Sequence, residues 1–166
     1  MNSSSRMLRL TASATLVLVS SSCGLVPAQP LRPELGVRVD GSIVSMLIPG
    51  CSTESIQSAH VYDRSEATFG PAVWSATGFV GQADGGVRFD GHDWSVTDGD
   101  YSGFPSIDVE VTTDLSIYGT YLDGAGNWER ATSLPAGSFL VGDKTMTATE
   151  YQRDVAQRFP CPTSGA

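Results

Sequence analysis

The segment that decides the fold is Ser106-Ile-Asp-Val-Glu-Val-Thr112, in which apolar and polar residues alternate without interruption. In an extended chain, successive side chains point to opposite sides. Ile107, Val109 and Val111 therefore share one side, and the polar residues share the other. The segment predicts a β-strand with one apolar and one polar face.

Shorter segments of the same kind lie on both sides of it. Residues 36–39 alternate, Asp40-Gly41 is a strong hairpin turn, and residues 42–48 form the returning strand. Further strands are expected at 56–62, 72–77, 86–89, 94–96, 115–122 and 128–132. Eight or nine short strands separated by turns indicate a mainly β fold, an antiparallel sandwich or barrel of about eight strands.

One helix is expected near the C-terminus, over residues 148–159. Thr147 and Glu150 have the spacing of a capping box, which marks the start of a helix. An apolar stripe follows at every fourth position, made of Tyr151, Val155 and Phe159. We expect this stripe to pack on the sheet.

The composition limits the number of domains and the class of partner. A chain of 166 residues, 40% hydrophobic and 17% charged, favours a single globular domain, which we place at 34–161 with a frayed tail at 162–166. Ten Lys and Arg against 18 Asp and Glu give a formal charge of −8. Because so acidic a chain repels phosphate backbones, we expect no nucleic-acid partner.

Residues 1–22 have the pattern of an export signal. Arg6 and Arg9 give a positively charged start, a ten-residue apolar stretch follows at 10–19, and three serines come after it. A membrane-spanning helix needs about 20 apolar residues, so the stretch predicts a signal peptide. Residues 23–33 carry a proline at every third position and predict an extended tether.

The junction Ser20-Ser21-Ser22-Cys23-Gly24 resembles the lipobox of bacterial lipoproteins. This resemblance implies acylation of Cys23, which becomes the mature N-terminus and anchors the protein to the outer face of the cell membrane. The alternative is cleavage after Ala28, which would discard Cys23 and release a secreted protein. With its proline tether, β-rich body and one Lys against nine Arg, the chain is similar to small secreted lipoproteins of actinobacteria. Most members of that class have no assigned function, so the resemblance implies a location and little else.

Either route leaves two cysteines, Cys51 and Cys161, which can pair in an oxidising compartment. They lie near the two ends of the domain, and the expected helix at 148–159 would bring Cys161 to Cys51. In the chain-entropy model, closing so long a loop stabilises the fold by about 4–5 kcal/mol. A catalytic or redox thiol is the alternative, but the sequence has no C-x-x-C motif and no histidine close to either cysteine. We therefore predict a disulfide.

The sequence predicts no catalytic residues and no cofactor. His60 falls on an expected strand and His92 in a turn, and neither lies in the context of a serine or cysteine nucleophile. A nucleophile elbow and a phosphate-binding glycine loop are both absent. Carboxylates are plentiful, and a pair of them in a cleft would make a glycosidase that sequence spacing does not reveal.

The segment from Asp98 to Gly103 begins like a calcium-binding EF-hand loop. Asp98, Asp100 and Ser102 would be its first ligands. The twelfth position, where such a loop needs a glutamate, is Val109. Because Asp and Gly also recur in ordinary turns, we expect a solvated turn and no metal site.

The aromatic residues leave two functions open. They are Trp74, Trp94 and Trp128, with Tyr101, Tyr118 and Tyr121. On an exposed sheet face they would form a platform for sugars; otherwise they are core residues. The leading expectation is a non-enzymatic envelope lipoprotein that binds a protein partner or stabilises an assembly, the alternative is a carbohydrate- or small-ligand-binding module, and a hydrolase comes third.

Overall fold

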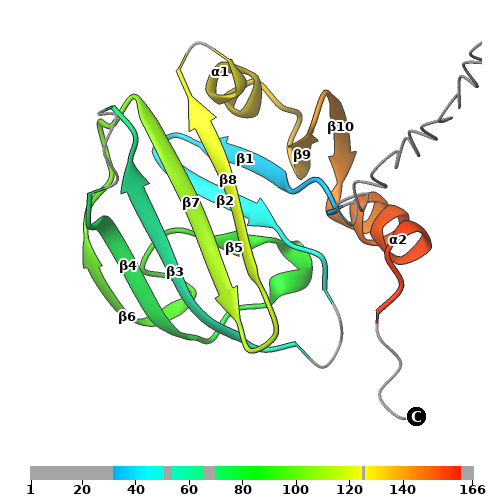
Figure 1. The fold of residues 1–166 in the computed structure, drawn as a ribbon. Coiled ribbons are helices and arrows are strands. Elements are labelled where there is room, and N and C mark those ends of the chain that lie inside the picture. The colour runs from blue at the N-terminus through cyan, green and yellow to red at the C-terminus, as the bar shows by residue number, and fades with distance from the viewer. Residues whose placement is uncertain (1–31, 51–53, 66–69, 125, 162–166) are drawn as a thin grey trace, which may run out of the picture. The chain divides into compact units, whose positions relative to one another are not determined.

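Two antiparallel sheets pack face to face, as Figure 1 shows for a computed structural model of the chain. The structure describes residues 32–50, 54–65, 70–124 and 126–161. Each sheet has five strands and neither closes into a barrel. The predicted sandwich is therefore confirmed, and the barrel alternative is wrong. Cys23, the signal peptide and all of the tether except Arg32 and Pro33 lie outside the described residues.

The first sheet, sheet A, has the strand order β10-β9-β1-β2-β5. Its strands are β1 (Gly36–Asp40), β2 (Ile43–Leu47), β5 (Val87–Arg88), β9 (Ser138–Val141) and β10 (Lys144–Thr147). The predicted Asp40-Gly41 turn joins β1 to β2, and Gly41 has the positive φ of 63° that such a turn requires. The pattern does not predict β9, because its apolar residues are buried on both faces and do not alternate.

The second sheet, sheet B, has the order β6-β4-β3-β7-β8. Its strands are β3 (Ile56–Asp63), β4 (Ala72–Phe79), β6 (Trp94–Gly99), β7 (Ser106–Thr113) and β8 (Ile117–Asp123). The alternation that predicts β7 is confirmed, because Ile107, Val109 and Val111 are fully buried whereas Asp108 and Glu110 are not.

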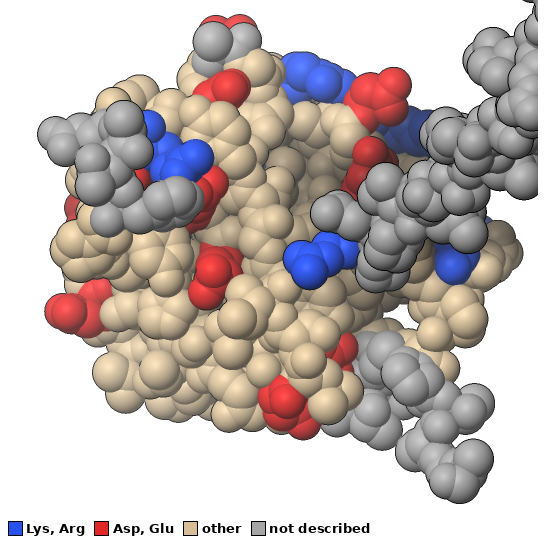
Figure 2. Space-filling model, in the orientation of Figure 1, with Lys and Arg blue, Asp and Glu red and all other residues tan. Residues whose placement is uncertain are grey.

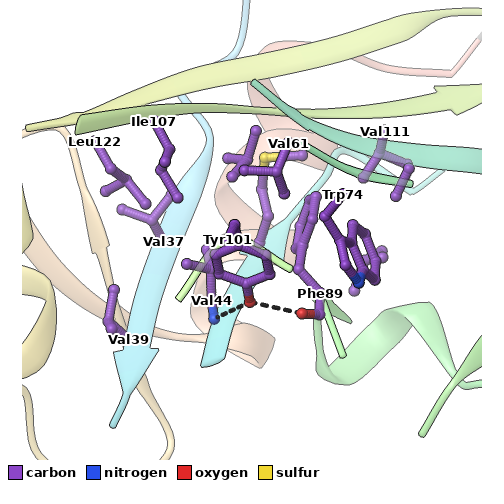
Figure 3. Close-up of a cluster of buried hydrophobic side chains, with 14 of the residues drawn as sticks. Val37, Val39, Val44, Val61, Trp74, Phe89, Tyr101, Ile107, Val111 and Leu122 are labelled. Carbon is purple, nitrogen blue, oxygen red and sulfur yellow. Dashed lines mark hydrogen bonds between the residues drawn. The ribbon is translucent and has the colours of Figure 1, made fainter. Parts of the chain in front are cut away.

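The core lies between the two sheets. Figure 3 shows valines of sheet A meeting Val61, Ile107, Val111 and Leu122 of sheet B, with aromatic rings packed among them. One of these rings belongs to Tyr101, which follows β6 in the chain and is buried in the core. Its hydroxyl accepts a hydrogen bond from Val44 N (3.1 Å) and donates one to Phe89 O (2.6 Å). Burial of this phenol raises its pKa to about 12.

The C-terminal helix is confirmed. Helix α2 spans Ala148–Arg158, and the Thr147 and Glu150 side chains form the predicted capping box. Tyr151 and Val155 are buried against the outer face of sheet A, where they contact Leu47, Phe139 and Val141. Those three side chains alternate along their strands with core-facing residues, so α2 covers the side of sheet A that is turned away from the core.

The strand expected at 128–132 is wrong: this segment is in helix α1 (Asn127–Thr132). The Asn127 side chain accepts a hydrogen bond from Asp123 N (2.9 Å) and donates one to Tyr121 O (2.6 Å), which turns the chain at the end of β8. Glu, Arg and Ala then favour a helical turn, and Ala131 is buried against the core. A short 3-10 turn, η1 (Ala83–Gly85), completes the described elements.

Candidate functional site

The two sheets differ in what covers their outer faces. Helix α2 packs on the outer face of sheet A, whereas no helix of the described chain lies over the outer face of sheet B (Figure 1). In the same orientation, Figure 2 shows that this open face is mostly uncharged, with separate acidic side chains and few basic ones. The outer face of sheet B is therefore the face of the sandwich that the described helices leave accessible to a ligand or partner.

Strand pairing places six residues in two neighbouring rows on this face. Their positions follow from the registers of β3, β7 and β8, because residues directly opposite each other share a face. The first row is Tyr62, Asp108 and Tyr121, and the second is His60, Glu110 and Gly119.

Except for His60, the residues of these rows line a hollow with a volume of about 600 Å³. Tyr62 and Tyr121 stand on either side of Asp108, and Gly119 leaves space beside Glu110. The volume falls within the range of about 300–1,000 Å³ that is usual for small-molecule sites. We call this feature the hollow.

Part of the hollow is held in place by an ion pair. Arg64 Nε lies 3.2 Å from Asp108 Oδ2, and the guanidinium carbon lies 5.7 Å from the centre of the Tyr121 ring. Tyr121 nevertheless keeps 40% of its surface exposed. The arginine thus positions both the carboxylate and the ring, and leaves much of the ring accessible.

Glu110 is the other carboxylate of the hollow. In the described part of the chain, no hydrogen bond or ion pair engages it. It lies close enough to Tyr62 to contribute to the raised pKa of that phenol, although burial is the larger cause. Glu110 is therefore available as a hydrogen-bond acceptor for a molecule in the hollow.

The second row continues across β4 to Ser75, which lies opposite His60. Ser75, His60 and Glu110 are the residue types of a serine-hydrolase triad, and sequence spacing could not bring them together because they come from three strands. Within the described residues no hydrogen bond joins these side chains. The row therefore lacks the nucleophile–base and base–acid hydrogen bonds that define such a triad.

The calcium candidates do not converge on one point. Asp98 lies in β6, with its backbone paired to Ser75, whereas Asp100 follows the strand. Both oxygens of Asp100 accept hydrogen bonds from Ser102, one from the backbone N–H (2.8 Å) and one from the hydroxyl (2.6 Å). These bonds lower the pKa of Asp100 and give the segment the geometry of a turn.

The other residues considered from the sequence lie away from the hollow or face the core. His92 is exposed in the turn before β6, where its N–H donates to Asp90. Trp74 and Trp94 are each only 5% exposed, and Trp128 packs on the core. The tryptophan platform is therefore wrong as a site, and the core interpretation of these rings is confirmed. The sequence has no signal that marks Tyr62 as a ligand contact, because only strand register places it in one row with Asp108 and Tyr121.

The predicted disulfide involves Cys51, which lies outside the described residues. Cys161 follows α2, and its Sγ lies 3.9 Å from the carbonyl oxygen of Gly50, the residue before Cys51. Gln152 of the same helix donates to Ile48 O (3.0 Å) and accepts from Gly50 N (3.3 Å). Helix α2 thus brings Cys161 next to the chain that leads into Cys51, as expected, and the bridge itself stays a prediction.

Comparisons with family models, with curated proteins and with solved structures find no match to this chain. Among the residues that the structure describes, none forms a helix long and apolar enough to span a membrane. The same residues include no group of three or more His, Cys, Asp or Glu side chains suited to a metal ion. The functional assignment therefore depends on the geometry of the outer face of sheet B.

Proposed function

We propose that this protein is an exported, non-catalytic binding domain, anchored to the cell membrane through Cys23, whose binding surface is the outer face of sheet B. The observation that carries the proposal is the asymmetry of the sandwich. One outer face is covered by the chain's own helix α2, while no helix among the described residues covers the other, which holds the hollow.

Binding is favoured over turnover by the chemistry of the open face. Asp108 is engaged by Arg64, and Ser75, His60 and Glu110 are not joined to one another by hydrogen bonds in the described structure. The three residues also lie within paired strands, whose N–H groups are committed to the ladder and do not form an oxyanion hole. An open sheet surface excludes little water from a reacting group.

A polar partner is favoured over an apolar one. Among the described residues, the large hydrophobic side chains that are exposed are spread over strands and loops; they are Val80, Val96, Leu115, Ile117 and Tyr121. On sheet B, Val96 and Ile117 lie on opposite edge strands, so they do not form a continuous apolar patch. The open face instead presents tyrosines and carboxylates, which suit a partner rich in hydrogen-bonding groups.

The proposal is tested by rebinding to the native envelope. The Cys23→Ala protein, released from its anchor, should rebind saturably to envelopes from cells that lack the gene. Thr112→Arg places a large side chain on the open face and should abolish rebinding, whereas Ala156→Arg, with the same charge on the exposed side of α2, should not. Equal rebinding by both variants would contradict the proposal. Fatty-acid labelling that persists in Cys23→Ala would contradict the anchor.

A further inference from the structure

We propose that the hollow on sheet B binds a neutral sugar residue of an envelope polysaccharide. This inference rests on the proposed function and names the chemistry of its ligand. The observations that support it concern four residues that line the hollow, namely Gly119, Tyr62, Tyr121 and the carboxylate of Glu110.

The first reason to place a sugar in the hollow is Gly119, because the backbone conformation at this position does not require a glycine. It lies within β8, and its φ is not among the positive values that other glycines adopt. A Cβ added at this position would meet only the Val109 carbonyl oxygen, at 3.4 Å, the short limit of ordinary contact. Glycine weakens a strand interior, and it often marks a place where a ligand approaches the backbone. Here the missing side chain opens the floor of the hollow.

The two tyrosines are the second reason. A sugar ring has a face of C–H groups and an edge of hydroxyls, so it is recognised by an aromatic ring beside hydrogen-bond acceptors. Tyr62 and Tyr121 flank Asp108 in one cross-strand row, and the guanidinium of Arg64 holds Tyr121. The exposed surface of Tyr121 can pack on the C–H face, because one side of the ring is free of Arg64.

The charges of the hollow favour a neutral ligand. Asp108 is already paired with Arg64, which leaves the Glu110 carboxylate as an acceptor for sugar hydroxyls. A phosphate or carboxylate ligand would lie beside Glu110 and be repelled. An amine is the competing ligand, since it would pair with Glu110 and stack on the tyrosines. Substituting Glu110 distinguishes the two: a hydroxyl can still donate to an amide oxygen, whereas an amine loses its ion pair.

The test is titration calorimetry of the purified exported protein with neutral trisaccharides, namely maltotriose, cellotriose, mannotriose, arabinotriose and chitotriose, and with spermidine as the cationic probe. At least one trisaccharide should bind saturably, with an affinity that does not change between low and high salt. Gly119→Val should reduce that affinity at least tenfold while leaving the melting temperature unchanged or higher, because valine is a better strand residue than glycine. Thr145→Val on β10 is the matched control and should bind normally.

Three further variants refine the result. Tyr121→Phe keeps the ring and should keep binding, Tyr121→Ala should lose it, and Glu110→Gln should weaken it by about tenfold, as for a charge-assisted hydrogen bond replaced by a neutral one. Binding of spermidine alone, lost in Glu110→Gln and screened by salt, would overturn the sugar assignment in favour of an amine. No saturable trisaccharide binding, or full binding by Gly119→Val, would also overturn it. If Thr112→Arg still blocks rebinding to envelopes in that case, the proposed function stands and only the sugar assignment fails.

Discussion

At the scale of single residues, Tyr101 shows how one hydroxyl connects two strands. Tyr101→Phe keeps the ring but leaves Val44 N and Phe89 O without this buried partner, so we expect a loss of about 2 kcal/mol in the free energy of unfolding. Tyr121→Phe removes an exposed hydroxyl and should change stability by less than about 0.5 kcal/mol. Urea unfolding of both variants measures the difference. Equal stability would mean that the Tyr101 bridge contributes nothing.

Glu150 gives a pH dependence whose sign can be stated. The Thr147 backbone N–H donates to its carboxylate (2.8 Å) and the Thr147 hydroxyl donates as well (2.9 Å), and these bonds lower the pKa of Glu150 below its ordinary value of 4.5. The ionised group therefore stabilises the folded state above pH 4.5, and this contribution is lost as the pH falls through the lowered pKa. Glu150→Gln should melt below the wild type at pH 7, and the gap should close in acid. A gap that stays constant from pH 7 to pH 3 would exclude this role.

Single residues also show what the sequence could predict. Ile107, Val109 and Val111 are identified as core residues by alternation alone, because period two leaves only one choice of face. Gly119 could not be recognised, because a glycine in sequence looks the same whether it serves a turn, a bulge or an open floor. The role of Gly119 is recognised only from the structure, which shows what a Cβ at this position would contact.

At the scale of elements, helix α2 is held by its apolar stripe. Val155 is 5% exposed and contacts sheet A, so Val155→Asp would bury a charge without a partner and should cost about 3 kcal/mol or more. The neighbouring Ala156→Asp places the same charge in water and should cost less than about 1 kcal/mol. Thermal melting compares the two, and similar melting temperatures would show that the stripe is not buried.

The sequence predicts a helix or strand correctly where the segment carries its own start signal and apolar pattern. Helix α2 has a capping box and a stripe, and both are present in the structure. The β9–β10 hairpin has neither alternation nor the Asn-Gly or Asp-Gly signal, and its turn begins with Gly142 at a φ of 59°. Helix α1 begins where the Asn127 side chain forms hydrogen bonds with the backbone of β8. The periodicity of the sequence does not predict this contact.

At the scale of the whole molecule, the Cys51–Cys161 bridge would tie the end of β2 to the end of α2. Gln152 already bonds to Ile48 and Gly50, and Cys161 Sγ lies near Gly50. We expect two thiols to appear only on reduction, and reduction to cost about 4–5 kcal/mol if the chain-entropy model holds. Mass spectrometry after alkylation in denaturant checks this. Alkylation of both cysteines without reductant would contradict the bridge.

The candidate site could not be predicted from the sequence, because it depends on how the strands are arranged in the whole molecule. Tyr62, Glu110 and Tyr121 lie on three different strands, and only the order β3-β7-β8 and its register place them side by side. The sequence predicts that each strand has a polar face. It does not predict which polar faces adjoin, or that α2 covers sheet A while no described helix covers sheet B.

The central claim, that the open face of sheet B meets the partner, is tested most directly by photo-crosslinking in living cells. A benzophenone amino acid replaces Ser75 or Thr112 on the open face, or Thr149 or Ala156 on the exposed side of α2. The account predicts a light-dependent adduct from Ser75 and Thr112 and none from the two α2 positions. Adducts of equal yield from both faces, or from α2 alone, would contradict it.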